Sequence, residues 1–542
     1  MIEPVRQAET AEIGGQDGPP PHTSRSRLRP VSAMVLVTAV FFALTLALSF
    51  RATWDADTAN VTLQGWDMIH GQVLLHGWWS TDVNFYTFDL PIYALTVLVF
   101  GLGDAAPHVA GSVVYTLIFV AACWLAKGRS TGSALWLRVA LVALFMSAAM
   151  FNGNAVGTYI TVPDHDGTFC FFLVAYVLYS RFADRRWTPW VMLALLTLGQ
   201  ISDLTTRYIL VPSLLVVWAV EHLRARRLRT PESWLALAAV GSVVLSFALR
   251  TAMIHLGAYY LAKANTKLAP ASQAGWHFTG TWESLMSLYG VDFADFPGGT
   301  AAQVAVTLIG GIAMVCGLLS TVWVLIRWTK VETADRLLAV TVIVYLGAYE
   351  FSTVGQPGGG NGYEFVGVVT AFAVLSARTA SSLPPLRLPS YRVASTALAG
   401  IGAFAFMLSG TSLFQSDLHP SLQPLSSWLE EHNMTYGLAG YFNASPITVF
   451  TKGKVSVRPI VPEPGSFIPR AWDARRQWFE PSKYDARFVI AEQDPNATLT
   501  VSQAEGAFGK PTTVYQVGQY QVLVYSYNLL TRGTPAKVGP GD

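Results

Sequence analysis

The sequence predicts a polytopic α-helical membrane protein of about eleven transmembrane helices with a C-terminal α/β domain. Hydrophobic residues make up 52% of the 542 residues and charged residues only 13%, where about 25% is usual for a soluble domain. The mean hydropathy is +0.38. Long apolar runs recur between residues 33 and 413, and a more polar segment follows them. A net charge of only +2 excludes a nucleic-acid binder driven by bulk charge, so the expected partner is the lipid bilayer and not a nucleic acid.

The first 30 residues are polar and rich in Gly, Pro, Ser and Arg. They contain no apolar core of the kind that a signal peptide needs. We therefore expect residues 1–30 to form a disordered cytoplasmic tail.

Eleven apolar runs follow, each near the ~20 residues that cross a bilayer when tilt is allowed. A further run at 90–102 has about a dozen residues and suits an interfacial or re-entrant helix better than a span. The eleven runs are 33–50, 107–126, 133–151, 167–181, 187–202, 208–223, 233–255, 303–326, 336–350, 363–377 and 391–413.

The placement of basic residues supports this count. With the N-terminus inside, the cytoplasmic loops contain nearly all the Arg and Lys residues that flank the spans, whereas the outer loops 152–166 and 351–362 contain none. This is the asymmetry expected of cytoplasmic loops. Counting 90–102 as a span would reverse every later loop. The cytoplasmic set is Arg25, Arg27, Arg29, Lys127, Arg129, Arg181, Arg185, Arg186, Arg224, Arg226, Arg227, Arg229, Arg327, Lys330, Arg336, Arg378, Arg387 and Arg392.

This topology predicts the domain organisation of a multi-pass cell-membrane protein. The transmembrane domain covers residues 31–414, with large outer loops at 51–106 and 256–302. Residues 415–542 form a soluble extracytoplasmic domain. A helix is expected near 425–432 in this domain. Its strands are expected at 455–461, 486–491 and 520–527, where β-branched and aromatic residues cluster.

Paired acids mark the predicted outer side. Asp55 and Asp57 follow the first span in WDADT, and Asp164 and Asp166 precede the fourth span in PDHDG. Acids at a membrane boundary are costly unless they are paired or hydrated, so they are candidates for function. Together the two pairs would form an acidic cleft suited to general-base chemistry or to a divalent cation, with Asp164 and Asp166 as candidate metal ligands. His165, between them, could orient an Asp, bind a metal or face solvent.

Other ionisable residues are predicted on the same outer side. Asp203 and Arg207 lie between the fifth and sixth spans, and Glu350 and Glu364 flank a Gly-rich turn. The sequence contains no Walker A motif, no G-x-G-x-x-G after a strand, no H-E-x-x-H and no G-x-S-x-G, which argues against an ATP-driven pump. Candidate substrate-binding residues are Asp164, His165, Asp166, Arg207, Lys263, Lys267 and Glu364.

By layout, residues 30–410 resemble the GT-C-fold glycosyltransferases, which include protein O-mannosyltransferases and the lipid A aminoarabinose transferase. The resemblance rests on an acid directly after the first span (Asp57), a helix that ends in WDMIHG at Gly71, and a Pro-containing juxtamembrane helix from Asp89-Leu90-Pro91 to Gly101-Leu102-Gly103. Asp164 or Asp166 matches the acid of the second outer loop. In this sequence Asp89-Leu90 stands where the family often has a basic residue, and Gly362-Tyr363-Glu364 replaces an Arg-Tyr pair.

The resemblance implies a hexosyl- or pentosyltransferase that uses a polyprenyl-phosphate sugar and an acceptor in the cell envelope: a glycan, a glycolipid or a protein. It implies Asp57 as the general base, with Asp55 as the alternative. The leaving lipid phosphate would need a cation from Arg207, Lys263, Lys267 or a metal. In the C-terminal domain, Tyr436, Tyr441, Phe442 and Trp472 could contact the acceptor, although aromatic residues are more often core.

Two other functions compete with the transferase. A transporter or flippase for lipid-linked sugars should place ionisable residues near the middle of the membrane, often in broken helices. Here the acids gather on one side, which favours the enzyme. A non-catalytic assembly subunit of the same fold is the third alternative. The sequence predicts neither the sugar nor an oligomeric state.

Overall fold

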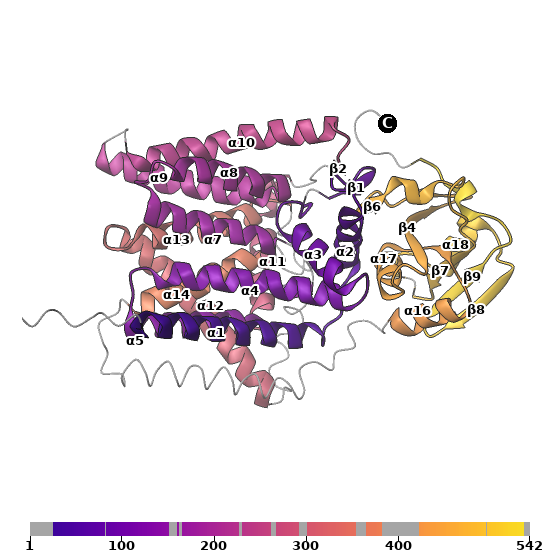
Figure 1. The fold of residues 1–542 in the computed structure, drawn as a ribbon, viewed down its shortest axis with the longest axis horizontal. Coiled ribbons are helices and arrows are strands. Elements are labelled where there is room, and N and C mark those ends of the chain that lie inside the picture. Colours follow the sequence, from indigo (N-terminus) through magenta and orange to yellow (C-terminus); the bar gives the residue numbers. More distant parts are fainter. Residues whose placement is uncertain are drawn as a thin grey trace, which may run out of the picture.

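The protein is described by a computed structural model, which covers residues 25–81, 83–150, 160–161, 165–226, 230–261, 267–291, 301–353, 365–381, 422–494 and 496–535. Figure 1 shows a helical bundle at one end of the molecule and a mixed α/β domain at the other. Short helices and strands from the first outer loop lie between the two parts.

Helices occupy ten of the eleven apolar runs, because continuous apolar sequence without internal breakers favours helices that pack on one another. The eleventh run, 391–413, lies outside the described residues. The bundle helices are α1 (Arg25–Ser49), α4 (Ala105–Lys127), α5 (Gly132–Met150), α7 (Asp166–Phe182), α8 (Thr188–Ser202), α9 (Val211–Ala225), α10 (Pro231–His255), α12 (Ala301–Ile326), α13 (Thr333–Glu350) and α14 (Val366–Ala380).

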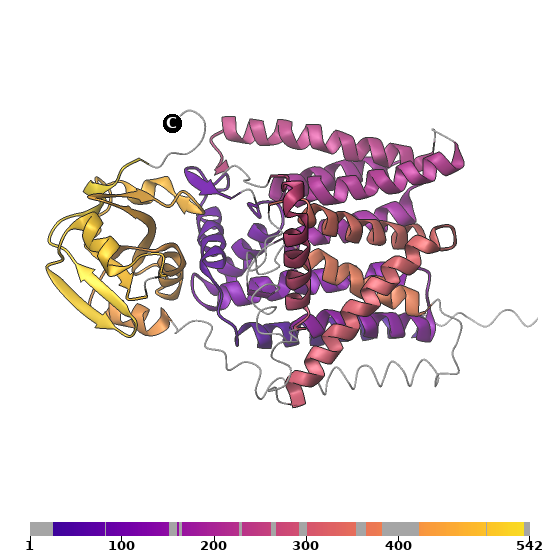
Figure 2. The ribbon, with the colours of Figure 1, turned by 180° about the vertical axis from the view of Figure 1, so that it is seen from behind.

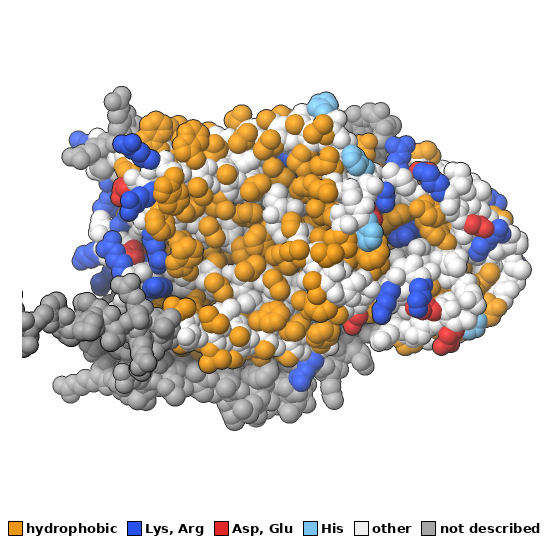
Figure 3. Space-filling model, in the orientation of Figure 1, with side chains coloured by type: hydrophobic (Ala, Val, Ile, Leu, Met, Phe, Trp, Pro, Cys, Tyr) orange, Lys and Arg blue, Asp and Glu red, His pale blue; other side chains and the backbone are white. Residues whose placement is uncertain are grey.

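Within the described residues, five helical segments are long and apolar enough to cross a membrane. They are Val31–Ser49, Ala105–Lys127, Thr206–Arg224, Pro231–His255 and Thr307–Ile326. The third includes a short π-helix, η2 (Thr206–Leu210), that leads into α9. The chain is thus a polytopic helical membrane protein, and the total of eleven spans stays a prediction. One face of the bundle is a broad band of hydrophobic side chains, with Lys and Arg gathered at the end away from the α/β domain (Figure 3).

Small residues allow the bundle helices to approach closely. A β-carbon on Gly317 of α12 would lie 2.2 Å from the ring of Phe372 on α14. A β-carbon on Gly111 of α4 would lie 1.8 Å from the carbonyl oxygen of Ile160. Helix α4 contacts α1, α3, α5, α7 and α14 and is the most buried of the candidate spans. The core of the bundle is therefore organised around α4.

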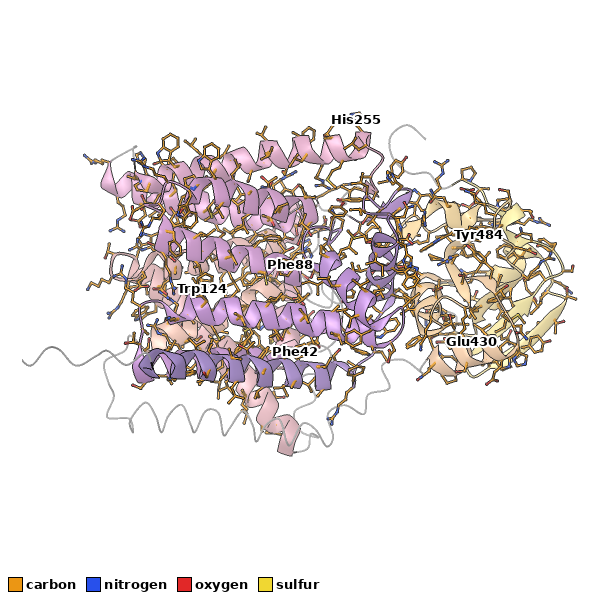
Figure 4. The ribbon with its side chains drawn as sticks, in the orientation of Figure 1. Phe42, Phe88, Trp124, His255, Glu430 and Tyr484 are labelled. Atoms are coloured by element: carbon orange, nitrogen blue, oxygen red, sulfur yellow. The ribbon has the colours of Figure 1, made fainter. Side chains whose placement is uncertain are left out.

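Three arginines neutralise the C-terminal end of α4. Arg378 donates to the carbonyl of Leu125 at 2.8 Å, and Arg138 donates to that of Ala126 at 2.8 Å. Arg181 donates to the carbonyl of Trp124 at 2.8 Å. These side chains satisfy carbonyls that lack a partner within the helix and oppose its negative end. Figure 4 marks Trp124 at this end of the bundle and Phe88 toward the end that faces the α/β domain.

Helices α2 (Ala56–Ile69) and α3 (Asp89–Phe100) lie at the opposite end, beside the α/β domain (Figure 1). They pack tightly, since a β-carbon on Gly65 would lie 2.9 Å from the backbone nitrogen of Ala94. With 12 residues α3 is too short to cross a bilayer on its own. Its last residues, Leu98, Val99 and Phe100, are exposed, as in a helix that lies at a membrane surface.

The C-terminal domain contains a six-stranded sheet of order β5-β4-β3-β7-β9-β8. The three central strands are parallel and the outer pairs are antiparallel. Apolar clusters lie on both faces, one against α16 and α17 and the other against α18. The elements are α16 (Leu422–Glu431), β3 (Tyr436–Ala439), α17 (Tyr441–Phe450), β4 (Ser456–Glu463), β5 (Ser466–Pro469), β6 (Ala474–Arg475), β7 (Phe488–Glu492), α18 (Val501–Phe508), β8 (Thr513–Val517) and β9 (Tyr520–Val524).

The helix and the three strands expected in this domain are present as α16, β4, β7 and β9. The predicted boundary at residue 415 lies outside the described residues and stays a prediction. The strand β6 belongs to a second sheet, described next, that the sequence did not predict.

This second sheet joins three distant parts of the chain. Strand β1 (Trp78–Ser80) lies between β2 (Tyr260–Leu261) and β6. Trp79 pairs in parallel with Tyr260 and in antiparallel with Ala474. A common apolar cluster includes Trp78 and Trp478. The C-terminal domain is therefore docked on both predicted outer loops, as the view from behind also shows (Figure 2).

Candidate active site

The first candidate acid, Asp55, begins helix α2. Its carboxylate accepts from the backbone nitrogen of Thr58 at 3.0 Å and from the hydroxyl of Thr58 at 3.0 Å. Aspartate is among the preferred residues at this capping position, because the first amides of a helix lack partners. Asp55 therefore has a structural role that accounts for its place in WDADT.

Asp57 lies in the first turn of α2 and is half-buried. The hydroxyl of Tyr441, from α17 of the C-terminal domain, donates a hydrogen bond to its Oδ1. Burial and then the charge of Asp55 raise the pKa of Asp57 to about 7, while the Tyr441 hydrogen bond and Arg470 oppose the rise. A carboxyl group with a pKa near neutrality can take up a proton at physiological pH, as a general base must.

Four polar residues continue along one face of α2, at the helical spacing of three and four residues. Each interacts with a residue of the C-terminal domain, whereas the Gly65 side of the helix packs on α3. Asp57 accepts from Tyr441, Asn60 Nδ2 donates to the Tyr441 hydroxyl at 3.2 Å, Gln64 Nε2 donates to Asp473 Oδ1 at 3.2 Å, and Asp67 accepts from Arg475 at 3.1 Å.

Asp473 is a second buried carboxyl group next to this face, with 1% of its surface exposed. Its Oδ1 also receives a weak hydrogen bond from Ser80 at 3.5 Å. Burial and then the charge of Asp57 raise the pKa of Asp473 well above its usual value. The backbone of Asp473 is left-handed, with φ of 44°, a conformation that is uncommon outside glycine and that often marks functional sites.

His165 and Asp166, at the start of α7, lie in a neighbouring polar cluster. His165 Nδ1 lies 2.7 Å from Asp203 Oδ2 and 3.0 Å from the hydroxyl of Thr205. Of the roles left open for His165, its contact with Asp203 fits orientation of an acid. Asp166 is buried at the start of α7, next to Gly167.

Asp89 connects the two clusters. It is buried, and its carboxylate lies 2.2 Å from where a β-carbon on Gly167 would be, so only glycine fits there. Burial and then the charges of Asp89, Asp55 and Asp166 raise the pKa of Tyr93 well above its usual value. One acid of each predicted pair, Asp55 and Asp166, therefore lies near the same tyrosine, and the shared cleft of both pairs stays a prediction.

The basic residues predicted to offset the phosphate charge lie in different surroundings. Arg207 is held within the bundle, where it donates to Gln200 Oε1 at 3.2 Å and to the Ser246 hydroxyl at 3.3 Å. Lys267 is exposed, and its backbone pairs with Thr353. Asp164, Lys263 and Glu364 lie outside the described residues. The roles of all these residues stay predictions.

A divalent cation was expected at Asp164 and Asp166. Across the described parts of the chain, no group of three or more His, Cys, Asp or Glu side chains could hold a metal ion. Asp164 is not among them, so the expected cation stays a prediction. The three cysteines, Cys123, Cys170 and Cys316, are free thiols.

Sequence reasoning missed the contribution of the C-terminal domain to this site. Tyr441 had been noted only as a possible acceptor contact, and Asp473 and Arg470 were not singled out. The hydrogen bond between Asp57 and Tyr441 spans 384 positions. No spacing rule connects such distant residues. No local pattern points to Asp473 either, since Trp-Asp occurs at Trp54-Asp55, Trp66-Asp67 and Trp472-Asp473 alike.

Comparison with known proteins agrees with this architecture. ArnT from Cupriavidus metallidurans in the apo state aligns over 94% of this chain and 100% of its own, with a TM-score of 0.54 and 11% identity. The chain has the GT-C fold. ArnT from the same organism bound to undecaprenyl phosphate aligns over 93% of this chain and 99% of its own, with a TM-score of 0.52 and 11% identity.

The oligosaccharyltransferase of Archaeoglobus fulgidus, crystallised with Zn and sulfate, aligns over 87% of this chain and 70% of its own, with a TM-score of 0.49 and 11% identity. No family model matches the sequence, and no curated protein matches it. The similarity to the two ArnT structures confirms, at the level of the fold, the GT-C resemblance predicted from the layout of the sequence.

Proposed function

We propose that this protein is a membrane glycosyltransferase that moves a sugar from a polyprenyl phosphate to a cell-envelope acceptor on the outer face of the membrane. The observation that carries the proposal is Asp57: a half-buried carboxyl group at the bundle end that faces the C-terminal domain, with a pKa of about 7. The fold supports a lipid donor, since ArnT of the same fold has been crystallised with undecaprenyl phosphate.

The reaction follows from the geometry of Asp57. Within the described residues, the recorded hydrogen bond to this side chain is on Oδ1, from Tyr441, which leaves Oδ2 for the acceptor. Oδ2 takes the proton of the acceptor hydroxyl while the oxygen of that hydroxyl bonds to the anomeric carbon of the donor sugar. The bond between that carbon and the phosphate oxygen breaks, and the lipid phosphate leaves with the electron pair. General-base assistance of this kind increases the reaction rate about 10²–10⁴-fold.

The leaving lipid phosphate acquires charge that a cation must offset. Lys263 and Lys267 of the second outer loop are our candidates, because β2 of this loop is paired with β1 next to the C-terminal domain. Arg207 is the less suitable candidate, because Gln200 and Ser246 already engage its guanidinium. We propose no metal-dependent step.

The transporter alternative predicts charged side chains in the middle of the bundle. Among the described residues, Asp55, Asp57 and Asp89 instead lie on or next to α2 and α3, at the bundle end that faces the C-terminal domain (Figure 1). This arrangement favours chemistry at one membrane surface over passage through the membrane.

Purified full-length protein should transfer sugar to a cell-envelope extract from at least one member of a panel of radiolabelled polyprenyl-phosphate sugars. Vesicles containing the protein and a fluorescent donor would report transbilayer movement in parallel. Transfer without movement supports the enzyme. Movement without transfer would contradict it and support a flippase, and donor binding with neither activity would support a non-catalytic subunit.

A further inference from the structure

The polar face of α2 is held almost entirely from the C-terminal domain. Asp57, Asn60, Gln64 and Asp67 contact a segment that begins at Tyr441 and ends at Arg475. The same segment provides β6, which pairs with β1. The domain thus lies directly on the residue that the proposed reaction uses as its base.

Tyr441 is fixed at the start of α17. The preceding Gly440 has no room for a side chain, since a β-carbon would lie 2.1 Å from the Thr498 hydroxyl. The Tyr441 ring lies edge-on to Phe442, with centroids 5.4 Å apart, and the guanidinium of Arg470 lies 5.5 Å from its centroid. Only 8% of Tyr441 is exposed. A tyrosine held in this way presents its hydroxyl at one defined position.

The two neighbours of the Tyr441 hydroxyl determine where its proton points. A tyrosine hydroxyl has one proton to donate. It receives a hydrogen bond from Asn60 Nδ2 at 3.2 Å and donates its own proton to Oδ1 of Asp57. The order Asn60, Tyr441, Asp57 therefore orients the carboxylate and leaves Oδ2 as its basic atom.

We propose that Tyr441 is a positioning residue for Asp57, so that the C-terminal domain is part of the catalytic unit and not a separate binding module. This inference rests on the proposed function of Asp57. It predicts that the Tyr441 hydroxyl matters to catalysis only through the orientation and the ionisation of that carboxyl group.

The charges and hydrogen bonds around Asp57 predict the direction in which its pKa changes when Tyr441 is altered. Asp55 at the start of α2 raises the pKa of Asp57, and Tyr441 from α17 and Arg470 before β6 lower it. Burial and then the charge of Asp57 raise the pKa of Asp473, the other acid beside α2, well above its usual value. Removing the Tyr441 hydroxyl takes away a hydrogen bond that favours the ionised base. The base should then need a higher pH to ionise.

The test compares Tyr441→Phe with the wild type in the pH dependence of kcat/KM for sugar transfer. We expect the midpoint of the rising limb to move to higher pH. Activity should fall about tenfold at pH 6.5 and return to within about threefold of the wild type at pH 9, since one pH unit changes the ionised fraction about tenfold. The matched control is Tyr527→Phe, which removes a hydroxyl that donates to the Phe508 carbonyl at 2.6 Å elsewhere in the same domain. It should leave the profile unchanged.

Other results would overturn the inference. An equal loss at every pH, with an unmoved midpoint, would mean that Tyr441 only supports domain packing. An unchanged profile would mean that it has no role. If the wild type transfers no sugar, the proposed function fails. The inference is then decided by infrared titration of the Asp57 carboxyl group, taken as the wild-type minus Asp57→Asn difference spectrum. Tyr441→Phe must raise that midpoint, and an unshifted midpoint rejects the inference.

Discussion

At the residue scale, WDADT assigns different tasks to two acids two positions apart. Asp55 caps α2 through Thr58, and Asp57 projects toward the C-terminal domain, where Tyr441 contacts it. The charge of Asp55 also raises the pKa of Asp57. The capping residue therefore helps to keep its neighbour a usable base near pH 7.

Replacing Asp55 with asparagine separates these effects. Asparagine caps helices about as well as aspartate, so α2 should be retained. Loss of the negative charge should lower the pKa of Asp57, because a like charge disfavours ionisation. We expect the rising limb of the kcat/KM profile to move to lower pH, opposite to the shift for Tyr441→Phe. A shift to higher pH, or none, would contradict this account of the base.

The resemblance identified Asp57 in the sequence, and the structure brings Asp57 and Tyr441 together, but its catalytic role stays a prediction. Tyr441 could not be found in this way. Its hydrogen bond to Asp57 depends on the docking of a whole domain, which no local pattern encodes. The same holds for His165, whose contact with Asp203 joins residues 38 positions apart.

At the element scale, the sequence predicted helices well and their supporting contacts poorly. Apolar runs predicted ten helices and the short helix α3, because a continuous apolar run without breakers favours a buried helix. Arg378, assigned to a cytoplasmic loop by its charge, is instead 5% exposed within α14. It caps α4 and pairs with Glu332 at 2.8 Å and with Asp335.

Removing Arg378 should destabilise this end of the bundle. Arg378→Leu removes the cation that pairs with Asp335 and Glu332 and donates to the Leu125 carbonyl. Breaking a buried ion pair such as that with Asp335 costs about 3–5 kcal/mol. The measurement is thermal unfolding in detergent micelles. Arg129→Leu, an exposed arginine at the same end, is the control and should unfold like the wild type. Equal unfolding temperatures for the two variants would show that the Arg378 contacts contribute little.

At the scale of the whole molecule, the C-terminal domain and the two outer loops form one unit. The β2-β1-β6 sheet, the cluster around Trp78 and Trp478, and the contact between Asp67 and Arg475 join parts that the sequence divides into separate domains. The sequence predicted the elements of the C-terminal domain, since alternation and turns are local. It did not predict the docking, which depends on a three-residue strand and a two-residue strand.

Loosening that docking should be visible without any substrate. Arg475→Ala removes the ion pair with Asp67, which is only partly exposed. We expect faster hydrogen–deuterium exchange in β1, β6 and the last turn of α2, where Asp67 lies. Arg487→Ala breaks an exposed ion pair with Asp485 inside the domain and should leave these segments unchanged. Unchanged exchange in Arg475→Ala would show that the apolar cluster alone maintains the docking.

The central claim is that Asp57 is the base of a sugar transfer, and one variant tests it most directly. Asp57→Asn keeps the shape of the side chain and the acceptor for Tyr441 but cannot take up a proton at neutral pH. We predict that, at pH 8, donor binding is unchanged while the transfer rate from the active polyprenyl-phosphate sugar falls at least about 100-fold. Transfer at the wild-type rate by a correctly folded Asp57→Asn protein would contradict the account.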